Sequence, residues 1–207
     1  MNYSELQTSL QSWSARSDAD VVSEVPNFIL FSTAMFNNGQ GGVKPLRVRE
    51  MMAVENLTPV SGVCTLPDDY LQYRRVIELA SRRRDLQYVT PTYADQEYSD
   101  RASGLSSDFT IIGSSLYMFP LSSNDIELTY YQTIPDLSDA APTNWLLTKQ
   151  PNLYLHAGLM QLAMFTKDND LFSRSAAVVT AVIDGLNSSD WMANMAKAGT
   201  RIKGVTP

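Results

Sequence analysis

The sequence predicts a mainly α protein in which helices from both ends of the chain form a bundle and a β-rich module is inserted between them, an α+β fold. Three observations support this. Apolar residues recur at helical spacing near both ends, short alternating segments lie between, and clusters of Pro, Gly, Asp, Asn and Ser separate those segments. The expected domains are 1–43 with 141–198 for the bundle, 44–140 for the β-rich insertion, and 199–207 for a separate C-terminal tail.

The first 37 residues have a helical pattern throughout. Ser4 can cap a first helix, Asp18 can cap a short second segment, and Pro26 suits the first turn of a third helix. The glycine-rich run 37–42 is expected to end this region.

The middle of the chain has the composition of short strands. Ile126, Leu128 and Tyr130 alternate with other residues, which is typical of a half-buried strand. Residues 91–98 have room for one or two helical turns. The expected strands are 47–55, 62–66, 73–79, 86–90, 109–113, 115–119 and 126–132.

The C-terminal part returns to a helical pattern. Pro142 and Pro151 suit the first turns of a short and a long helix. Residues 153–165 are apolar almost all round, which predicts a buried helix. Asp168 or Asn169 can cap a last helix with an apolar stripe on one face.

Composition excludes several classes of protein. Only 18% of the 207 residues are charged, against about 25% in an average domain, and the net charge of −6 disfavours a broad phosphate-binding face. The single cysteine, Cys64, rules out a disulfide framework and a four-cysteine zinc site. Since the N-terminus lacks signal-peptide character and no apolar run approaches a membrane span, we expect a soluble protein of a reducing compartment, without membrane contact.

Two familiar catalytic systems are disfavoured. The lone histidine, His156, lies in the most apolar helical segment, which is typical of a core or interface histidine and not of a catalytic base. The glycine-rich run 38–44 lacks Gly-Lys-Ser/Thr and follows a helix, whereas a phosphate-binding loop follows a strand.

Paired carboxylates leave one enzymatic alternative open. The pair Asp68-Asp69 and the group Asp95, Glu97 and Asp100 could serve a glycosidase, although Pro-Asp-Asp is also turn chemistry. We favour the prediction of no enzyme, with no catalytic residue, cofactor or metal.

Charge is distributed unevenly along the chain. Residues 44–84 carry a net +3, and residues 85–139 a net −8. The two blocks can be solvated faces, can pair internally, or can meet between neighbouring subunits and close a head-to-tail ring. The basic candidates for a subunit or partner interface are Arg74, Arg75, Arg82, Arg83 and Arg84, and the acidic candidates for an interface or a channel wall are Asp95, Glu97, Asp100 and Asp108.

The C-terminal tail is too short and polar to pack by itself. It can be a frayed end, or Arg201, Ile202 and Lys203 can order as an added strand or anchor on a partner.

Several stretches together resemble a known family. They are TLPDDYLQYRRV (65–76), FTIIGSSLYMFP (109–120), the run 126–165 and GTRIKG (199–204). In this order they are similar to the head-to-tail adaptor, or connector, proteins of tailed bacteriophages. The most specific part is the run that contains Tyr130, Tyr131, Ile134, Pro135, Leu137, Ser138, Asn144, Trp145, Leu146 and Leu147.

The resemblance implies a structural protein of the virion neck, made in the cytoplasm of the bacterial host. Such adaptors assemble as a ring, usually of twelve copies, beneath the portal protein and offer a platform to a tail or nozzle protein. DNA would pass through the ring without specific binding. The tail 199–207, with Arg201, Ile202 and Lys203, would then dock on the portal protein.

A binding module stays open as an alternative. A carbohydrate- or surface-binding β domain of a virion or a cell could use Tyr93, Tyr98, Tyr117 and Tyr130 as an aromatic platform, although aromatic residues in such strands are more often part of the core.

Overall fold

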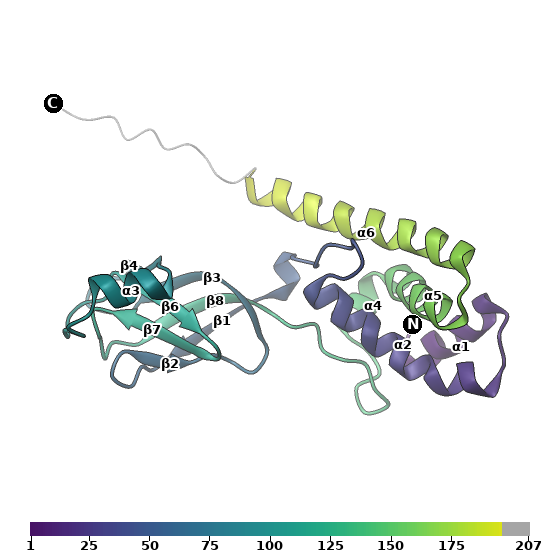
Figure 1. Ribbon diagram of the computed structural model, residues 1–207, viewed down its shortest axis with the longest axis horizontal. Helices are drawn as coiled ribbons and strands as arrows, with labels where there is room; N and C mark the ends of the chain where they lie inside the picture. Colours follow the sequence, from purple (N-terminus) through teal and green to yellow (C-terminus); the bar gives the residue numbers. More distant parts are fainter. Residues whose placement is uncertain (196–207) are drawn as a thin grey trace. The chain divides into compact units, whose positions relative to one another are not determined.

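The computed structural model describes the backbone of residues 1–195 and the side chains of residues 1–192. It divides into two compact units (Figure 1). Of the described residues, 1–49 and 134–195 make up the helical unit, and Glu50–Thr133 make up the β unit. With six helices and two sheets in the described part, 45% helical and 23% strand, the structure confirms the predicted mixture of α and β.

The helical unit begins with α1 (Tyr3–Ser14). The prediction that Ser4 caps this helix is wrong, because Asn2 occupies the cap position. Asn2 Oδ1 accepts a hydrogen bond from the Glu5 N–H at 2.9 Å, and Glu5 Oε2 accepts one from the Asn2 N–H at 2.9 Å. This reciprocal pair satisfies two backbone donors that the first turn would otherwise leave open.

The next helix, α2 (Ala19–Asn38), is continuous, so the two segments expected here are one helix. Pro26 lies inside it, and both Pro26 and Val22 are exposed. The carbonyl that loses its partner at a proline therefore lies on the solvent side, where water can bond it. Gly39, with φ +74°, ends the helix as predicted. Glycine is needed at this position because a Cβ would lie 2.9 Å from the Val43 carbonyl oxygen.

The remaining helices of this unit are α4 (Trp145–Lys149), α5 (Pro151–Thr166) and α6 (Asn169–Met195). α5 packs against α1, α2, α4 and α6, and it is buried on nearly every face, as its composition predicted (Figure 1). Gly158 permits the close approach to α1, because a Cβ at this position would lie 2.7 Å from a methyl group of Leu10.

Of the three predicted starts of the C-terminal helices, two are confirmed and one is wrong. Pro151 is in the first turn of α5 and Asp168 caps α6 by accepting from the Leu171 N–H at 2.9 Å, both as predicted. Pro142 is not in a first turn. α4 begins after Asn144, whose side chain accepts from the Leu147 N–H at 2.8 Å.

The β unit contains two four-stranded sheets. One has the order β1-β8-β3-β4, with every neighbouring pair antiparallel. The other has the order β2-β7-β6-β5, with only β5 and β6 parallel. The strands are β1 (Met52–Leu57), β2 (Val63–Thr65), β3 (Tyr70–Glu78), β4 (Arg84–Asp85), β5 (Gln87–Tyr88), β6 (Asp108–Ile112), β7 (Ser115–Phe119) and β8 (Ile126–Gln132); a 3-10 turn, η1 (Arg49–Met51), precedes β1, and α3 (Pro91–Glu97) follows β5.

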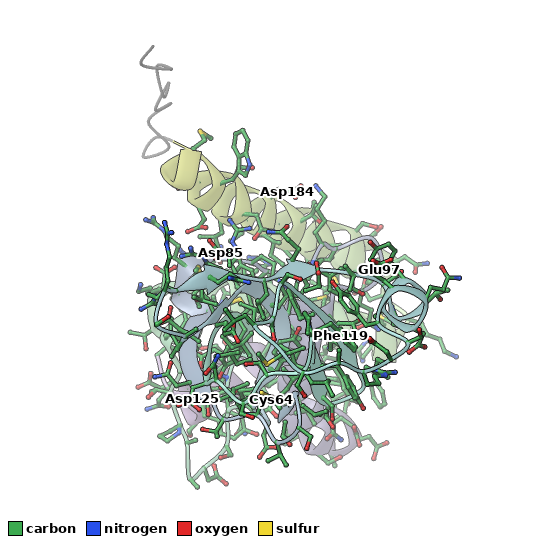
Figure 2. All side chains as sticks on the ribbon, turned by 90° about the vertical axis from the view of Figure 1, so that its left-hand side faces the viewer. Cys64, Asp85, Glu97, Phe119, Asp125 and Asp184 are labelled. Carbon is green, nitrogen blue, oxygen red and sulfur yellow. The ribbon has the colours of Figure 1, made fainter. Side chains whose placement is uncertain are left out.

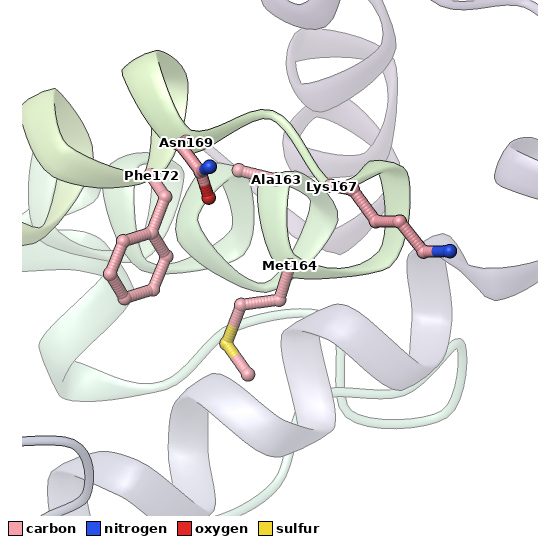
Figure 3. Close-up of a pocket in the computed structure, with 5 residues that line it drawn as sticks. All are labelled: Ala163, Met164, Lys167, Asn169 and Phe172. Carbon is pink, nitrogen blue, oxygen red and sulfur yellow. The ribbon is translucent and has the colours of Figure 1, made fainter.

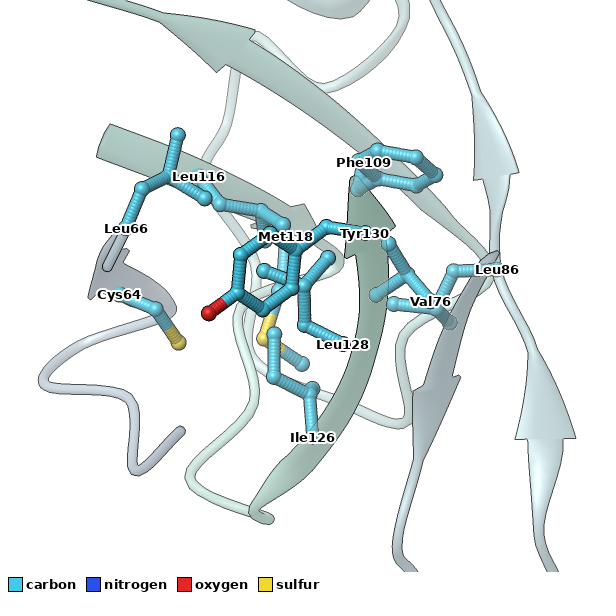
Figure 4. Packing of buried hydrophobic residues seen from close by; sticks show 10 residues of the cluster. All are labelled: Cys64, Leu66, Val76, Leu86, Phe109, Leu116, Met118, Ile126, Leu128 and Tyr130. Atoms are coloured by element: carbon cyan, nitrogen blue, oxygen red, sulfur yellow. The ribbon is translucent and has the colours of Figure 1, made fainter. Parts of the chain in front are cut away.

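Side chains from both sheets form one core (Figure 4). Ile126, Leu128 and Tyr130 of β8 face it, which confirms the predicted alternation. The expected strand 86–90 is much shorter in the structure, because Pro91 starts α3 directly after it. Among the helices in the described range, none is both long and apolar enough to cross a membrane.

Candidate interaction surfaces

Part of the predicted basic cluster is paired inside the β unit. Arg75 makes two hydrogen bonds to Asp85, at 2.5 and 2.8 Å, and Arg83 bonds Glu127 at 2.5 Å. The bond from Arg75 lowers the pKa of the Asp85 carboxyl. Internal pairing, one of the alternatives left open by the sequence, therefore holds for these two arginines.

The other members of the cluster are differently placed. Arg74, Arg82 and Arg84 are exposed, and they form no ion pair with any residue that the structure describes. Their positive charge is therefore available to a partner.

The predicted acidic residues separate in a similar way. Asp95 pairs with Arg101 at 2.8 Å. Half-buried Asp108 accepts hydrogen bonds from the Tyr98 hydroxyl and, at 2.6 Å, from the Ser107 hydroxyl. The bond to Asp108 raises the pKa of Tyr98. Asp108 thus has a role inside the unit.

Two of the predicted acidic side chains, Asp100 and Glu97, are exposed to solvent. Among the described residues, Asp100 accepts only from the backbone N–H of Ala102, at 3.2 Å, and Glu97 is exposed without an ion pair. Figure 2 shows Glu97 and Asp85 toward opposite sides of the β unit. Because Asp85 is bonded to Arg75, this arginine and Glu97 of α3 belong to different sides of the β unit.

An aromatic hollow lies beside the basic cluster. Tyr73 and Tyr88 stack with ring centroids 5.6 Å apart, and the edge of each meets Phe109, at 5.2 and 5.7 Å. The hollow has a volume of about 500 Å³, and Arg74 and Arg75 also line it. An aromatic floor beside cationic groups suits an aromatic or acidic side chain.

In the helical unit, polar side chains of α6 bind the segment 44–49 that leads toward β1. Asn187 accepts from the Arg47 N–H at 2.8 Å and donates to the Pro45 carbonyl at 3.0 Å. Asp190 accepts from the N–H and the Nε of Arg49, at 3.1 and 2.8 Å. These bonds replace those of a neighbouring strand, which is why the expected strand 47–55 begins only at residue 52.

The segment in which the chain returns from the β unit to the helical unit, beginning at Ile134, is anchored near the end of α2. The Asn37 side chain accepts from the Ile134 N–H at 2.9 Å, while the Asn37 carbonyl accepts from Arg47 at 2.9 Å. Asn144 donates to the Pro135 carbonyl at 2.8 Å. The sequence places Asn37 at the start of the glycine-rich run and Asn144 within the run 126–165, but it did not predict these hydrogen bonds.

Large apolar side chains are exposed near the C-terminal end of α6. Trp191 is 62% exposed and Met192 is 60% exposed. They line a hollow of about 400 Å³ together with the ion pair between Lys44 and Asp184, at 3.0 Å. The predicted docking residues Arg201, Ile202 and Lys203 lie outside the described residues.

A second apolar hollow, of about 380 Å³, lies where α5 passes into α6. Met164 and Phe172 line it, and Lys167 extends away from them (Figure 3). Phe165 is 49% exposed and touches Phe28 of α2. The sequence missed this surface, since an exposed apolar residue at the end of a buried helix has the same pattern as a core residue.

Two of the residues considered for catalysis, His156 and Asp69, contact aromatic side chains of the fold. The ring of His156 meets Trp13 edge-on at 5.8 Å, and burial lowers the pKa of His156. Asp69 accepts from the Tyr130 hydroxyl at 2.9 Å; burial and this bond raise the pKa of Tyr130. At 3% exposure Tyr130 cannot belong to an exposed aromatic platform, which corrects that expectation. Within residues 1–192, no cluster of His, Cys, Asp and Glu could hold a metal ion.

The described part of the chain thus combines charged surfaces on the β unit with polar side chains of the helical unit that bond the segments leading into and out of the insertion. The chain belongs to the SU10 adaptor protein family of phage head-tail adaptors, whose model matches residues 1–201. The resemblance found in the sequence is thereby confirmed. No curated protein sequence matches the chain significantly.

Membership of this family establishes the function in outline. The family consists of structural phage proteins and is not known for enzymatic activity. The chain is therefore a phage adaptor protein and a component of the virion, and its family implies contacts with portal and tail proteins.

Proposed function

We propose that the chain forms a ring in the virion neck, docks beneath the portal protein, continues the DNA channel and carries the tail or nozzle protein. The observation that supports this best is the placement, on the β unit, of charges that form no ion pair with the residues the structure describes. Asp85, which lines the same hollow as Arg74, lies toward one side of the β unit, and Glu97 lies toward the other (Figure 2). Copies placed head to tail would bring the two sides together.

Such a contact is heterologous, because each copy uses two different surfaces. Heterologous contacts close into a ring when the rotation between copies divides a full turn, and they otherwise make an open filament. We propose a closed ring of twelve copies, with the helices of 1–43 and 141–198 as a bundle, residues 44–140 as its insertion and residues 199–207 as a portal-docking tail.

DNA would pass without specific binding. The net charge of −8 over residues 85–139 repels phosphates wherever these acids line a channel, and phosphate contacts would slow passage. We propose that Asp100 and Glu97 contribute either to this wall or to the subunit contact. The protein would be made in the host cytoplasm before it enters the virion.

Charge reversal tests the ring. In the variant Arg74→Glu, Arg82→Glu, Arg84→Glu we expect ring assembly to weaken at least about tenfold, since like charges then face one another across the contact. The measurement is the mass of the chain, alone and with its portal protein, by native mass spectrometry. Arg16→Glu, at an exposed arginine of the helical unit that pairs with Asp18 at 3.5 Å, controls for charge reversal outside the β unit.

A wild-type chain that forms no ring, even with its portal protein, would contradict the proposal. If the triple variant formed normal rings at every concentration, the proposed contact between the charged surfaces would be contradicted. Deletion of residues 199–207 should leave the circular dichroism of the chain unchanged and weaken portal binding, and undiminished binding would refute the docking role of the tail.

A further inference from the structure

The β unit carries an aromatic hollow and, elsewhere on its surface, an exposed tyrosine on a short acidic helix. We propose that the two fit one another in neighbouring copies: Tyr93 of one copy enters the hollow formed by Tyr73, Tyr88 and Phe109 of the next. The inference rests on the proposed ring and names the contact that would hold it together.

The hollow has the shape and chemistry for a ring. Tyr88 is 44% exposed, although it stacks on Tyr73 and meets Phe109, so part of its ring remains uncovered by the described residues. The open volume of about 500 Å³ is within the range that holds small organic groups. Another aromatic side chain could complete the cluster with the edge-to-face geometry that such rings prefer.

Tyr93 is held outward by the local structure. Thr90 caps α3 by accepting from the Tyr93 N–H at 3.3 Å, and Pro91 fixes the first turn. Ala94, which is 1% exposed, is buried where α3 packs against β6. Tyr93 itself is 50% exposed, and within the described residues its ring meets no other ring and its hydroxyl makes no hydrogen bond.

The charges around the two features are complementary. Arg74 lines the hollow and has no ion pair in the described part of the chain. Glu97 follows Tyr93 by four residues, so both belong to one face of α3. With Tyr93 in the hollow, Glu97 would come near Arg74, and the desolvated contact would strengthen their attraction.

The positions of the two features favour a head-to-tail partner over a symmetric dimer. Asp85, which lines the hollow, and Glu97 of α3 lie toward opposite sides of the unit (Figure 2). One copy can therefore give Tyr93 to one neighbour and receive the tyrosine of another. A second copy of this chain is the occupant that carries the matching tyrosine and the matching charge.

Cross-linking between two different variants tests the contact directly. Gln96→Cys places a thiol on α3, and Gln87→Cys places one at the hollow, both at exposed positions. The native Cys64 does not interfere, because burial and the nearby Asp125 raise its pKa to about 11 and leave the thiol protonated. A short bismaleimide should join the two variants when they are mixed under ring-forming conditions, and neither variant alone.

The matched control replaces Gln87→Cys by Thr58→Cys, an exposed position outside the hollow. Rings that form normally without a cross-link between Gln96→Cys and Gln87→Cys would overturn the contact and leave the proposed function intact. Equal cross-linking of the Thr58→Cys control would also overturn it. A wild-type chain that never forms rings would overturn both.

Truncation of the tyrosine gives an independent measure. Tyr93→Ala should raise the concentration needed for assembly at least about tenfold, the usual loss at a central aromatic contact residue, while Tyr93→Phe should stay within about threefold because it keeps the ring. Val54→Ala, which removes methyl groups from another exposed position, serves as control. Unchanged assembly of Tyr93→Ala, with normal circular dichroism, would contradict the proposal.

Discussion

The two units use their polar side chains in different ways. In the helical unit, Asn37, Asn144, Asn187 and Asp190 bond the backbone of the segments that lead into and out of the insertion. In the β unit, several charged side chains point outward, and Glu97 lacks an ion pair among the described residues. The helical unit is therefore the scaffold that holds the segments entering and leaving the insertion, and we propose that the charges of the β unit serve recognition.

Removal of a central ring from the scaffold should have the largest effect. Phe36 is fully buried, and Tyr154 packs edge-on against it at 5.1 Å. Phe36→Ala should lower the free energy of unfolding of the helical unit by about 3–5 kcal/mol, through lost burial and a cavity. Urea unfolding followed by circular dichroism measures this.

The β unit supplies the comparison for this experiment. Val54→Ala, at a 62% exposed position, should change the stability by no more than about 0.5 kcal/mol. A loss below about 1 kcal/mol for Phe36→Ala would contradict the view that packing between α2 and α5 stabilises the helical unit.

Hydrophobic periodicity predicted most of the fold, because burial decides the main elements in both units. The apolar stretch 153–165 became the central helix, and the alternation of Ile126, Leu128 and Tyr130 became a core strand. Two of the errors fell where polar side chains decide the boundary. Asn2 was missed as a cap, and the expected strand at 47–55 was shortened because Asn187, far away in sequence, binds its first residues.

The candidate surfaces were only partly predictable for the same reason. Sequence shows that five arginines stand beside an acidic stretch, but it does not show which of them find internal partners. Arg75 and Arg83 do, with Asp85 and Glu127, while Arg74 does not within the described chain. The aromatic hollow was invisible to sequence reasoning, because it joins Tyr73 of one sheet to Tyr88 of the other.

A smaller effect is expected when the anchor of segment 44–49 is cut. Asp190 is 8% exposed and binds both the backbone and the side chain of Arg49. Asp190→Ala leaves these donors without their acceptor and should destabilise the helical unit by about 1–3 kcal/mol. It should also speed hydrogen exchange of the Arg49 amide, which mass spectrometry can follow.

Asp184→Ala is the matched control for that variant. Asp184 pairs with Lys44 at the surface, where the side chains are 45% and 72% exposed, so its removal should cost less than about 1 kcal/mol. Equal losses for the two variants would contradict the view that α6 fixes this segment through buried polar bonds.

The smallest effect concerns the pH dependence of the β unit. The Arg75 guanidinium lowers the pKa of Asp85 in the folded chain, so the pair contributes stability above the unfolded value of about 3.9, and this stability is lost as the pH falls through the folded pKa. Because both side chains are more than half exposed, the contribution is at most about 1 kcal/mol. Asp85→Asn should therefore be slightly less stable than the wild type at pH 6, and the difference should shrink as the pH falls below about 3.9. Glu97→Gln, which removes a carboxylate without an ion pair in the described chain, should follow the wild type over this pH range; a loss as large as that of Asp85→Asn would mean that Glu97 stabilises the fold and is not reserved for a partner.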